Sequence, residues 1–327
     1  MKHLTFALLT LLLFSSCLKD DIITESYNET EFKQKMRDFV IGISMYSKTI
    51  NTSFNIVLQN GIELVSSNGD ILDQPNSAYL NAIDANGQED LFFGYDNDDQ
   101  ATPSSSTTYW KNLLDISKNA NKKILVTDYC STFSKMDSSI LQNNNSDYVS
   151  FAANQRELNN IPSYPTTITQ QNNPVVKSMD QVKNFLYLIN PSNYPTKSSF
   201  IDALTATNYD LLIIDLFFSD GTPFSAAEIS QLKNKANGGK RLVISYMSIG
   251  EAENYRYYWQ AAWNTNKPIW MDAENPDWVG NFKVKYWNTA WQDIIYGNDS
   301  SYIKKILDTG FDGVYLDIID AFEFYEN

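Results

Sequence analysis

The chain has 327 residues, a formal net charge of −14 and a single histidine, His3. We expect His3 to be removed with a targeting segment, so the mature protein has no imidazole, which excludes Ser-His-Asp catalysis, Cys-His catalysis and histidine-based metal sites. The acidic charge argues against nucleic acid as a partner, because phosphates require Lys and Arg, and acid–base chemistry is left to Asp, Glu, Tyr, Lys or Cys130.

Residues 1–16 are predicted to be a signal peptide. Lys2 and His3 form a basic start, and the apolar run from Leu4 to Phe14 has 11 residues, whereas about 20 are needed to span a bilayer. Small residues precede Cys17, as in a bacterial lipobox, and "CLKDD" resembles the surface-export signal of Bacteroidetes lipoproteins. We therefore expect lipidated Cys17 to anchor a surface-exposed outer-membrane lipoprotein. An ordinary signal peptide cleaved near Ser16 is the alternative.

The mature chain is predicted to consist of a polar tether, residues 17–28, and one domain, residues 29–327. Apolar residues recur at helical spacing from Phe32 to Ile50. Cys130 follows the apolar stretch "KKILVTDYC", and lipidation of Cys17 leaves it without a partner. We therefore expect Cys130 to be a buried thiol.

Short apolar runs come after the first helix along the rest of the chain. They cover residues 54–61, 123–129, 147–153, 185–191, 209–218, 241–248, 283–287 and 312–320. Continuous Val, Ile and Leu without alternation are typical of strands buried on both faces of a parallel sheet.

Helix signals lie between several of these runs. Ser225 to Glu228 is a capping box, with Gly238-Gly239 as the expected end of that helix, and Thr289 to Gln292 repeats the pattern. Asp299 can cap a further helix that Gly310 closes. Alternation of eight strands with helices predicts a (β/α)8 barrel. An open doubly wound sheet is the alternative, although the sequence has no Gly-rich phosphate loop.

Polar and acidic residues lie at the ends of the predicted strands, where a (β/α)8 barrel carries its active site. They are Gln59, Asn60, Asp128, Asn190, Asp215, Glu251, Glu253, Asp317 and Asp320. Two carboxyl groups can hydrolyse a glycosidic bond without histidine or metal, so we expect no metal and no cofactor. Tyr255, Tyr257, Tyr258 and Trp259 offer ring faces for sugars, or pack between helix and barrel.

Three motifs, "SIGEAENYRYYW", "NPDWVGNFKVKYW" and "GFDGVYLDIIDA", resemble those of the family 114 glycoside hydrolases, typified by endo-α-1,4-polygalactosaminidases. The resemblance covers residues 185–326 and implies a barrel that cleaves an amino-sugar polysaccharide within the chain. The upstream half is similar to the segment that extracellular relatives carry after the last motif. This order implies a circular permutation, which a closed barrel tolerates because its termini lie close together.

The resemblance also implies residue roles. It implies catalytic roles for Asp215, Glu253 and Asp317, while Asn281 stands where fungal members have a Glu. Arg256 is expected to orient a carboxylate through a forked hydrogen bond. Further substrate contacts are expected from Asn60, Glu89, Asp128, Tyr246, Glu251 and Asp320. Because of Asn281, a non-catalytic glycan-binding lipoprotein on a decayed barrel is the alternative. A structural or adhesion protein of the envelope is a third hypothesis.

Overall fold

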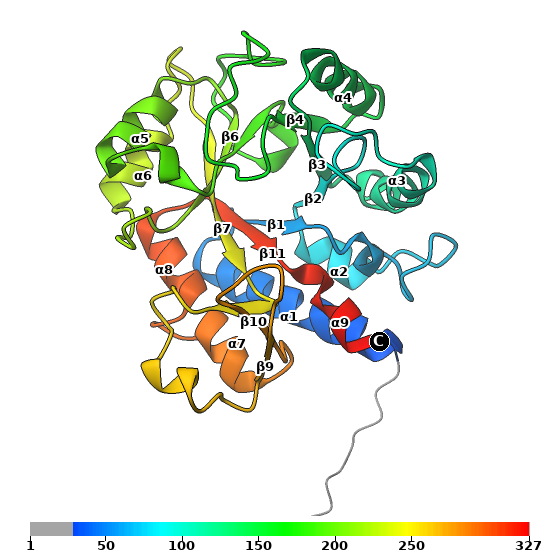
Figure 1. The fold of residues 1–327 in the computed structure, drawn as a ribbon, viewed down its shortest axis with the longest axis vertical. Helices are drawn as coiled ribbons and strands as arrows, with labels where there is room; N and C mark the ends of the chain where they lie inside the picture. Colours follow the sequence, from blue (N-terminus) through cyan, green and yellow to red (C-terminus); the bar gives the residue numbers. More distant parts are fainter. Residues whose placement is uncertain (1–28, 327) are drawn as a thin grey trace, which may run out of the picture.

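Eight parallel strands adopt the order β4-β3-β2-β1-β11-β7-β6-β5 in the computed structural model, which describes residues 29–326 (Figure 1). The strands are β1 (Asn55–Gln59), β2 (Ala85–Glu89), β3 (Lys123–Tyr129), β4 (Val149–Ala153), β5 (Phe185–Tyr187), β6 (Leu211–Asp215), β7 (Leu242–Ser248) and β11 (Gly313–Asp317). The edge strands β4 and β5 face each other, with the Phe151 and Phe185 rings 5.5 Å apart. The sheet is thus a nearly closed barrel, which confirms the predicted (β/α)8 fold.

Helices surround this barrel (Figure 1). They are α1 (Glu29–Ile50), α2 (Ser77–Ala82), α3 (Ser104–Asn119), α4 (Phe133–Asn145), α5 (Lys197–Thr205), α6 (Ala226–Leu232), α7 (Thr289–Ile295), α8 (Tyr302–Thr309) and α9 (Phe322–Glu326). No helix among residues 29–326 has both the length and the apolar character needed to cross a bilayer. Cys130 is buried and its thiol is free, as predicted, whereas Cys17 and the predicted signal peptide lie outside the described residues.

One predicted barrel strand was wrong, and one barrel strand was missed. Residues 281–284 form β10 (Asn281–Val284), which pairs antiparallel with β8 (Glu251–Glu253) and β9 (Met271–Glu274) in a separate small sheet. The missed barrel strand is β2, whose sequence "ANGQE" has no β-branched residue. Strand β2 is instead held by its two neighbours in the sheet, β1 and β3, a tertiary effect that local propensity does not register.

Polar groups inside the barrel explain why β2 is polar. Gly87 faces Tyr315, and a Cβ at this position would lie far inside van der Waals contact distance of the Tyr315 hydroxyl oxygen. That hydroxyl donates a hydrogen bond to Gln59 on β1. A glycine on β2 is therefore what lets the bulky ring of β11 cross the barrel interior.

The two ends of the described chain meet. Strand β11 pairs in parallel with β1, and α1 packs against α8 and α9 (Figure 1). Lys33 on α1 lies 2.5 Å from Glu326 on α9. The first helix thus lies in the layer between the last and the first barrel strands, where a permuted chain would place it; the permutation itself stays a prediction.

Local signals at the helix ends have mixed outcomes. Ser225 forms the predicted capping box, but α6 ends at Leu232, well before the two glycines. Asn288 caps α7, because its side chain accepts from the Ala290 N–H, so Thr289 is not the cap. The N-cap residue of α8 is Ser301 rather than Asp299, and Gly310 closes this helix in the left-handed conformation as predicted.

Candidate active site at the mouth of the barrel

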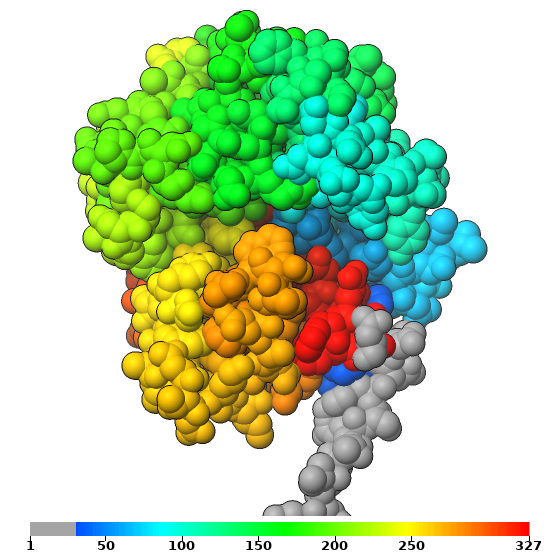
Figure 2. All heavy atoms as spheres, viewed as in Figure 1, coloured from blue at the N-terminus to red at the C-terminus, as the bar shows by residue number. Residues whose placement is uncertain are grey.

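A cavity of about 570 Å³ lies at the carboxyl ends of the barrel strands. In Figure 2 the surface is hollowed between the upper, green part of the molecule and the lower, orange and red part. Nine of the ten residues predicted to be catalytic or to bind substrate line this cavity: Asn60, Glu89, Asp215, Tyr246, Glu251, Glu253, Arg256, Asp317 and Asp320. Side chains from strands far apart in sequence thus converge at one mouth.

Asp215 and Glu253 share one guanidinium. Arg256 Nη1 lies 2.9 and 2.7 Å from the two carboxylate oxygens of Asp215, and its Nε lies 2.6 Å from Glu253 Oε2. The Tyr255 hydroxyl donates to Glu253 at 2.5 Å. Burial raises the pKa of Asp215, and Arg256 acts against that rise. Arg256 therefore orients two carboxylates, one more than the sequence predicted.

Asp317 is the third predicted catalytic carboxylate, and it faces the same cavity. Its Oδ2 accepts from the Tyr246 hydroxyl at 2.7 Å, and its Oδ1 accepts from the Ile318 N–H at 2.8 Å. Ile318 has a φ of 57°, which is strained for a β-branched residue. Burial, with a smaller effect from the nearby Glu253 and Glu251, raises the pKa of Asp317 to about 6, although these two hydrogen bonds lower it. Asp317 can therefore carry a proton at mildly acidic pH.

Glu89 reaches the cavity from β2. The Tyr129 hydroxyl donates to its carboxylate, and Arg156 stacks over the Tyr129 ring with 3.9 Å between Cζ and the ring centroid. Burial and the charge of Asp317 raise the pKa of Glu89 to about 7. Asn60, with a φ of 58°, accepts from the Glu89 N–H at 3.0 Å and so ties the end of β1 to the end of β2.

Glu251 is held on several sides. Lys283 Nζ lies 2.7 Å and Asn275 Nδ2 lies 2.8 Å from Glu251 Oε1, and Asn281 Nδ2 lies 3.3 Å from Glu251 Oε2. The small sheet creates this contact, because it pairs Asn281 with Glu253 and Lys283 with Glu251. A carboxylate therefore lies next to Asn281, the residue that departs from the family pattern.

Asp128 does not line the cavity, and its prediction as a substrate contact was wrong. Side chains alternate along a strand, and on β3 the side chain of Tyr129 reaches Glu89, so Asp128 points to the other face. It accepts from the Phe92 and Phe93 N–H groups, from Ser139 and from Asn143, at 2.6–3.2 Å. Asp128 is a fully buried anchor for the loop after β2 and for α4.

Four aromatic residues were suggested from the sequence as sugar contacts, and only one of them, Tyr255, lines the cavity. Tyr255 is 64% exposed and lines the cavity. Tyr257 packs on Phe217, and Tyr258 on Trp291. These two rings agree with the alternative interpretation, packing between helix and barrel, as does Trp259, which packs on Trp263 and Phe282.

Sequence reasoning missed several residues of the cavity. Tyr129 ends one predicted strand and Tyr187 lies within another, so their inward position could have been found from strand alternation. Arg156 and Trp278 lie in loops, and Trp278 is 60% exposed. An exposed tryptophan on a cavity wall is typical of a site that stacks sugar rings, but no pattern in the sequence places that loop over the barrel.

Residues 165–327, about half of the chain, match the sequence model of glycoside-hydrolase family GH114. This part of the chain belongs to the GH114 family. The family is one of glycoside hydrolases, and the assignment agrees with the barrel and with the converging carboxylates at its mouth. Within residues 29–326, no three His, Cys, Asp or Glu side chains are arranged to hold a metal ion.

Three curated relatives are similar to part of the chain. An uncharacterized protein of Deinococcus radiodurans is 41% identical over 127 residues, 39% of this chain and 38% of its own length. One of Methanocaldococcus jannaschii is 37% identical over 176 residues, 50% of this chain and 48% of its own. One of Thermotoga maritima is 36% identical over 122 residues, 37% and 36% of the two chains. The chain thus spans less than half the length of each of these relatives.

Proposed function

We propose that the cavity hydrolyses glycosidic bonds within an amino-sugar polysaccharide, in the manner of an endo-α-1,4-polygalactosaminidase, with Asp215, Glu253 and Asp317 as its working carboxylates. The observation that carries the proposal is the shared guanidinium of Arg256, which holds Asp215 and Glu253 in the same cavity as Asp317. Hydrolysis needs one carboxyl group that holds a proton and one that stays ionised.

The environments of the three carboxylates suit different roles. Asp317, with its pKa raised to about 6 by burial, is the proposed acid that protonates the leaving oxygen. Asp215 contacts the Arg256 cation, which acts against the rise in its pKa that burial causes, and Glu253 contacts the same cation. We assign to Asp215 either the attack on the anomeric carbon or the activation of water. Glu253 is the second candidate for the same role.

The charge of the cavity supports a cationic substrate. Seven acidic side chains line it (Glu89, Glu157, Asp215, Glu251, Glu253, Asp317 and Asp320), against two arginines, Arg156 and Arg256. A cleft lined mainly by one sign of charge concentrates ligands of the opposite sign. A polymer with free amino groups fits this field, and Trp278 and Tyr255 offer ring faces beside it.

The proposal is tested by incubating the protein with polymers of galactosamine and glucosamine and reading the products by mass. Asp215→Asn should lose roughly 100-fold or more in turnover, the typical contribution of one acid–base group. Asp308→Asn, an exposed change on α8, is the matched control and should keep full activity. Equal turnover by wild type and Asp215→Asn would end the assignment.

A second function is favoured by one observation, Asn281 at the position of the family Glu. In that case the protein binds the glycan without cleaving it. Asn281 Nδ2 donates to Glu251 Oε2 at 3.3 Å, so Glu251 is a carboxylate able to replace the family Glu if the protein is a hydrolase. Retained affinity of the wild type for the polymer, with no new reducing ends, would support binding alone.

We also propose that Cys17 carries lipid and anchors the protein, through residues 17–28, to the outer membrane, on the outer surface of the cell. The support is the sequence "LFSSCLKDD". Metabolic labelling with an alkyne fatty acid should mark the wild type, and the label should be lost in Cys17→Ser. Unchanged labelling of that variant would contradict lipidation at this residue.

A further inference from the structure

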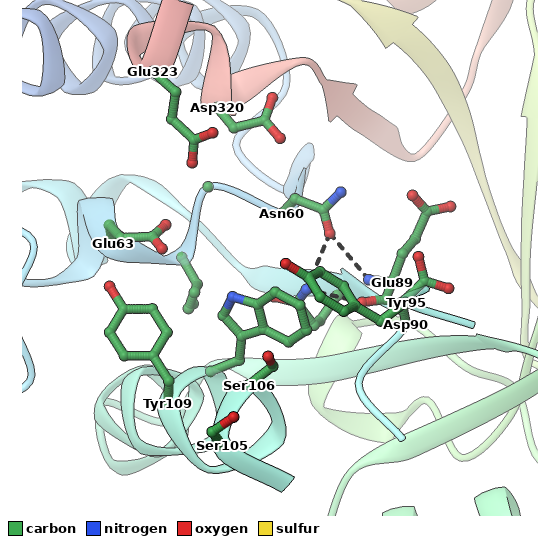
Figure 3. A pocket seen from close by; sticks show the side chains of 14 residues that line it. Asn60, Glu63, Glu89, Asp90, Tyr95, Ser105, Ser106, Tyr109, Asp320 and Glu323 are labelled. Atoms are coloured by element: carbon green, nitrogen blue, oxygen red, sulfur yellow. Dashed lines mark hydrogen bonds between the residues drawn. The ribbon is translucent and has the colours of Figure 1, made fainter. Parts of the chain in front are cut away.

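A second cavity, of about 600 Å³, adjoins the first. The two share three lining residues, Asn60, Glu89 and Asp320. Its other walls come mostly from residues 61–110, the half of the chain outside the GH114 match, and from the start of α9 (Figure 3). The inference drawn from this cavity rests on the proposed function.

The walls of the second cavity are rich in carboxyl groups, and one of these, Asp90, is paired with Arg156 at 2.9 Å. Five carboxylates line it: Glu63, Glu89, Asp90, Asp320 and Glu323. No Lys or Arg is among its described lining residues. In Figure 3, Asp320 and Glu323 project from one wall, and Glu63 lies on another. Burial, followed by the charges of Asp317, Glu323 and Glu63, raises the pKa of Asp320 to about 8. A bound cation would relieve this crowding of like charges.

A buried acceptor in the same wall also points to a ligand. Gln88 is only 4% exposed, and its Oε1 has no hydrogen-bond partner among the described residues. Its Nε2 is satisfied, because it donates to the Glu89 carbonyl at 2.9 Å. Buried side-chain acceptors are normally paired, so this oxygen is free to accept from a hydroxyl or an ammonium group in the cavity.

Aromatic rings complete the cavity. Tyr95 and Tyr109 are 50% and 41% exposed, and the Tyr95 ring meets Trp110 edge-on at 5.1 Å. Burial and the neighbouring Glu63 carboxylate raise the pKa of Tyr109 to about 12. A metal ion would be bound by the carboxylates alone. An amino sugar contacts both features, because its ring stacks on aromatic faces and its ammonium group pairs with carboxylates.

We propose that the second cavity is a distal subsite that binds one protonated amino-sugar unit of the polymer whose cleavage takes place over Asp215 and Asp317. The shared wall of Asn60, Glu89 and Asp320 lets one chain occupy both cavities. The subsite acts in binding rather than in chemistry, so its removal affects long substrates and leaves short ones unchanged. It also selects against N-acetylated units, which have no positive charge.

Two variants test the subsite in the enzyme as it exists. Glu63→Gln removes a charge, and Tyr109→Ala removes an exposed ring. Each should raise KM for a long galactosamine polymer roughly five- to tenfold, with kcat and the turnover of a trimer within twofold of wild type. The controls are Asp308→Asn and Phe133→Ala, an exposed aromatic change on α4. An unchanged KM in both test variants would overturn the subsite and leave the proposed function standing.

Calorimetry separates the subsite from catalysis. The probes are an α-1,4-linked galactosamine hexamer and its fully N-acetylated form, titrated into the Asp215→Asn protein. We expect the free-amine hexamer to bind at least tenfold more tightly, and Glu63→Gln to remove most of that preference. If the wild type cleaves nothing yet shows this preference, the hydrolase proposal fails and a cationic-sugar site remains. Equal affinity for the two hexamers would overturn the cationic selectivity.

Discussion

Replacing Arg256 by Met is the most direct perturbation of the candidate site. Arg256 is 8% exposed, and the side chains of Asp215 and Glu253 are 12% and 2% exposed. The methionine fills much of the same volume but removes the only cation that contacts both carboxylates among the described residues. Two buried like charges are then left facing each other.

The magnitude can be worked out from the burial of the pair. Removing one partner of a buried ion pair costs about 3–5 kcal/mol, because the remaining charge is desolvated without compensation. We therefore expect Arg256→Met to lose about 3–5 kcal/mol of unfolding free energy at pH 8. The loss should shrink at pH 5, because burial raises the pKa of Asp215, and without the Arg256 cation this carboxylate takes up a proton more readily in the folded state. If the pKa of this one group rises by two units, the difference is at most about 2.7 kcal/mol.

Urea unfolding monitored by tryptophan fluorescence measures the loss of unfolding free energy at pH 5 and at pH 8. The triple variant Arg256→Met, Asp215→Asn, Glu253→Gln is the control, and it should recover most of the loss because the stranded charges are gone. A loss below about 1 kcal/mol at pH 8 would refute the reasoning, since it lies in the range of exposed pairs. An equal loss at pH 5 and pH 8 would refute the electrostatic origin.

Three further predictions concern the fold and its pH dependence. Gly87→Ala should destabilise the barrel by about 1–3 kcal/mol through overpacking against Tyr315. Adding Tyr315→Phe should return part of this loss in a double-mutant cycle measured by urea unfolding. If the losses of the two single variants simply add, the steric clash is contradicted. Asp128→Ala should lower the free energy of unfolding by about 3 kcal/mol or more, because buried hydrogen-bond donors lose their acceptor. The kcat/KM of the folded protein should stay unchanged. A large fall in kcat/KM would show that Asp128 belongs to the active site. Burial raises the pKa of Asp320 to about 8, so the free energy of unfolding should fall as the pH rises from about 4 to 8, by at most about 1.4 kcal/mol per pH unit. Asp320→Asn should flatten this dependence of unfolding free energy on pH between pH 5 and 9. An unaltered dependence would assign it to other groups.

Much of the barrel was predictable from local sequence. Seven of the eight predicted runs are barrel strands, because a strand buried on both faces must be apolar along its whole length. Where a polar strand is buried, this signal disappears. Strand β2 satisfies its backbone through β1 and β3 and places Gly87 against Tyr315, partners that lie far away in the chain.

The sequence by itself narrowed the chemistry open to the protein, because a chain whose single histidine is His3 leaves acid–base chemistry to Asp, Glu, Tyr, Lys or Cys130 once the predicted signal peptide is removed. It also placed carboxylates at the ends of predicted strands, where a barrel carries its active site. Only the tertiary structure decided which carboxylates meet. Asp128 points away from the cavity because side chains alternate along β3. Asp215 and Glu253 both contact Arg256, and the small sheet places Glu251 beside Asn281. These outcomes depend on register and on contacts between distant segments, which no local pattern encodes.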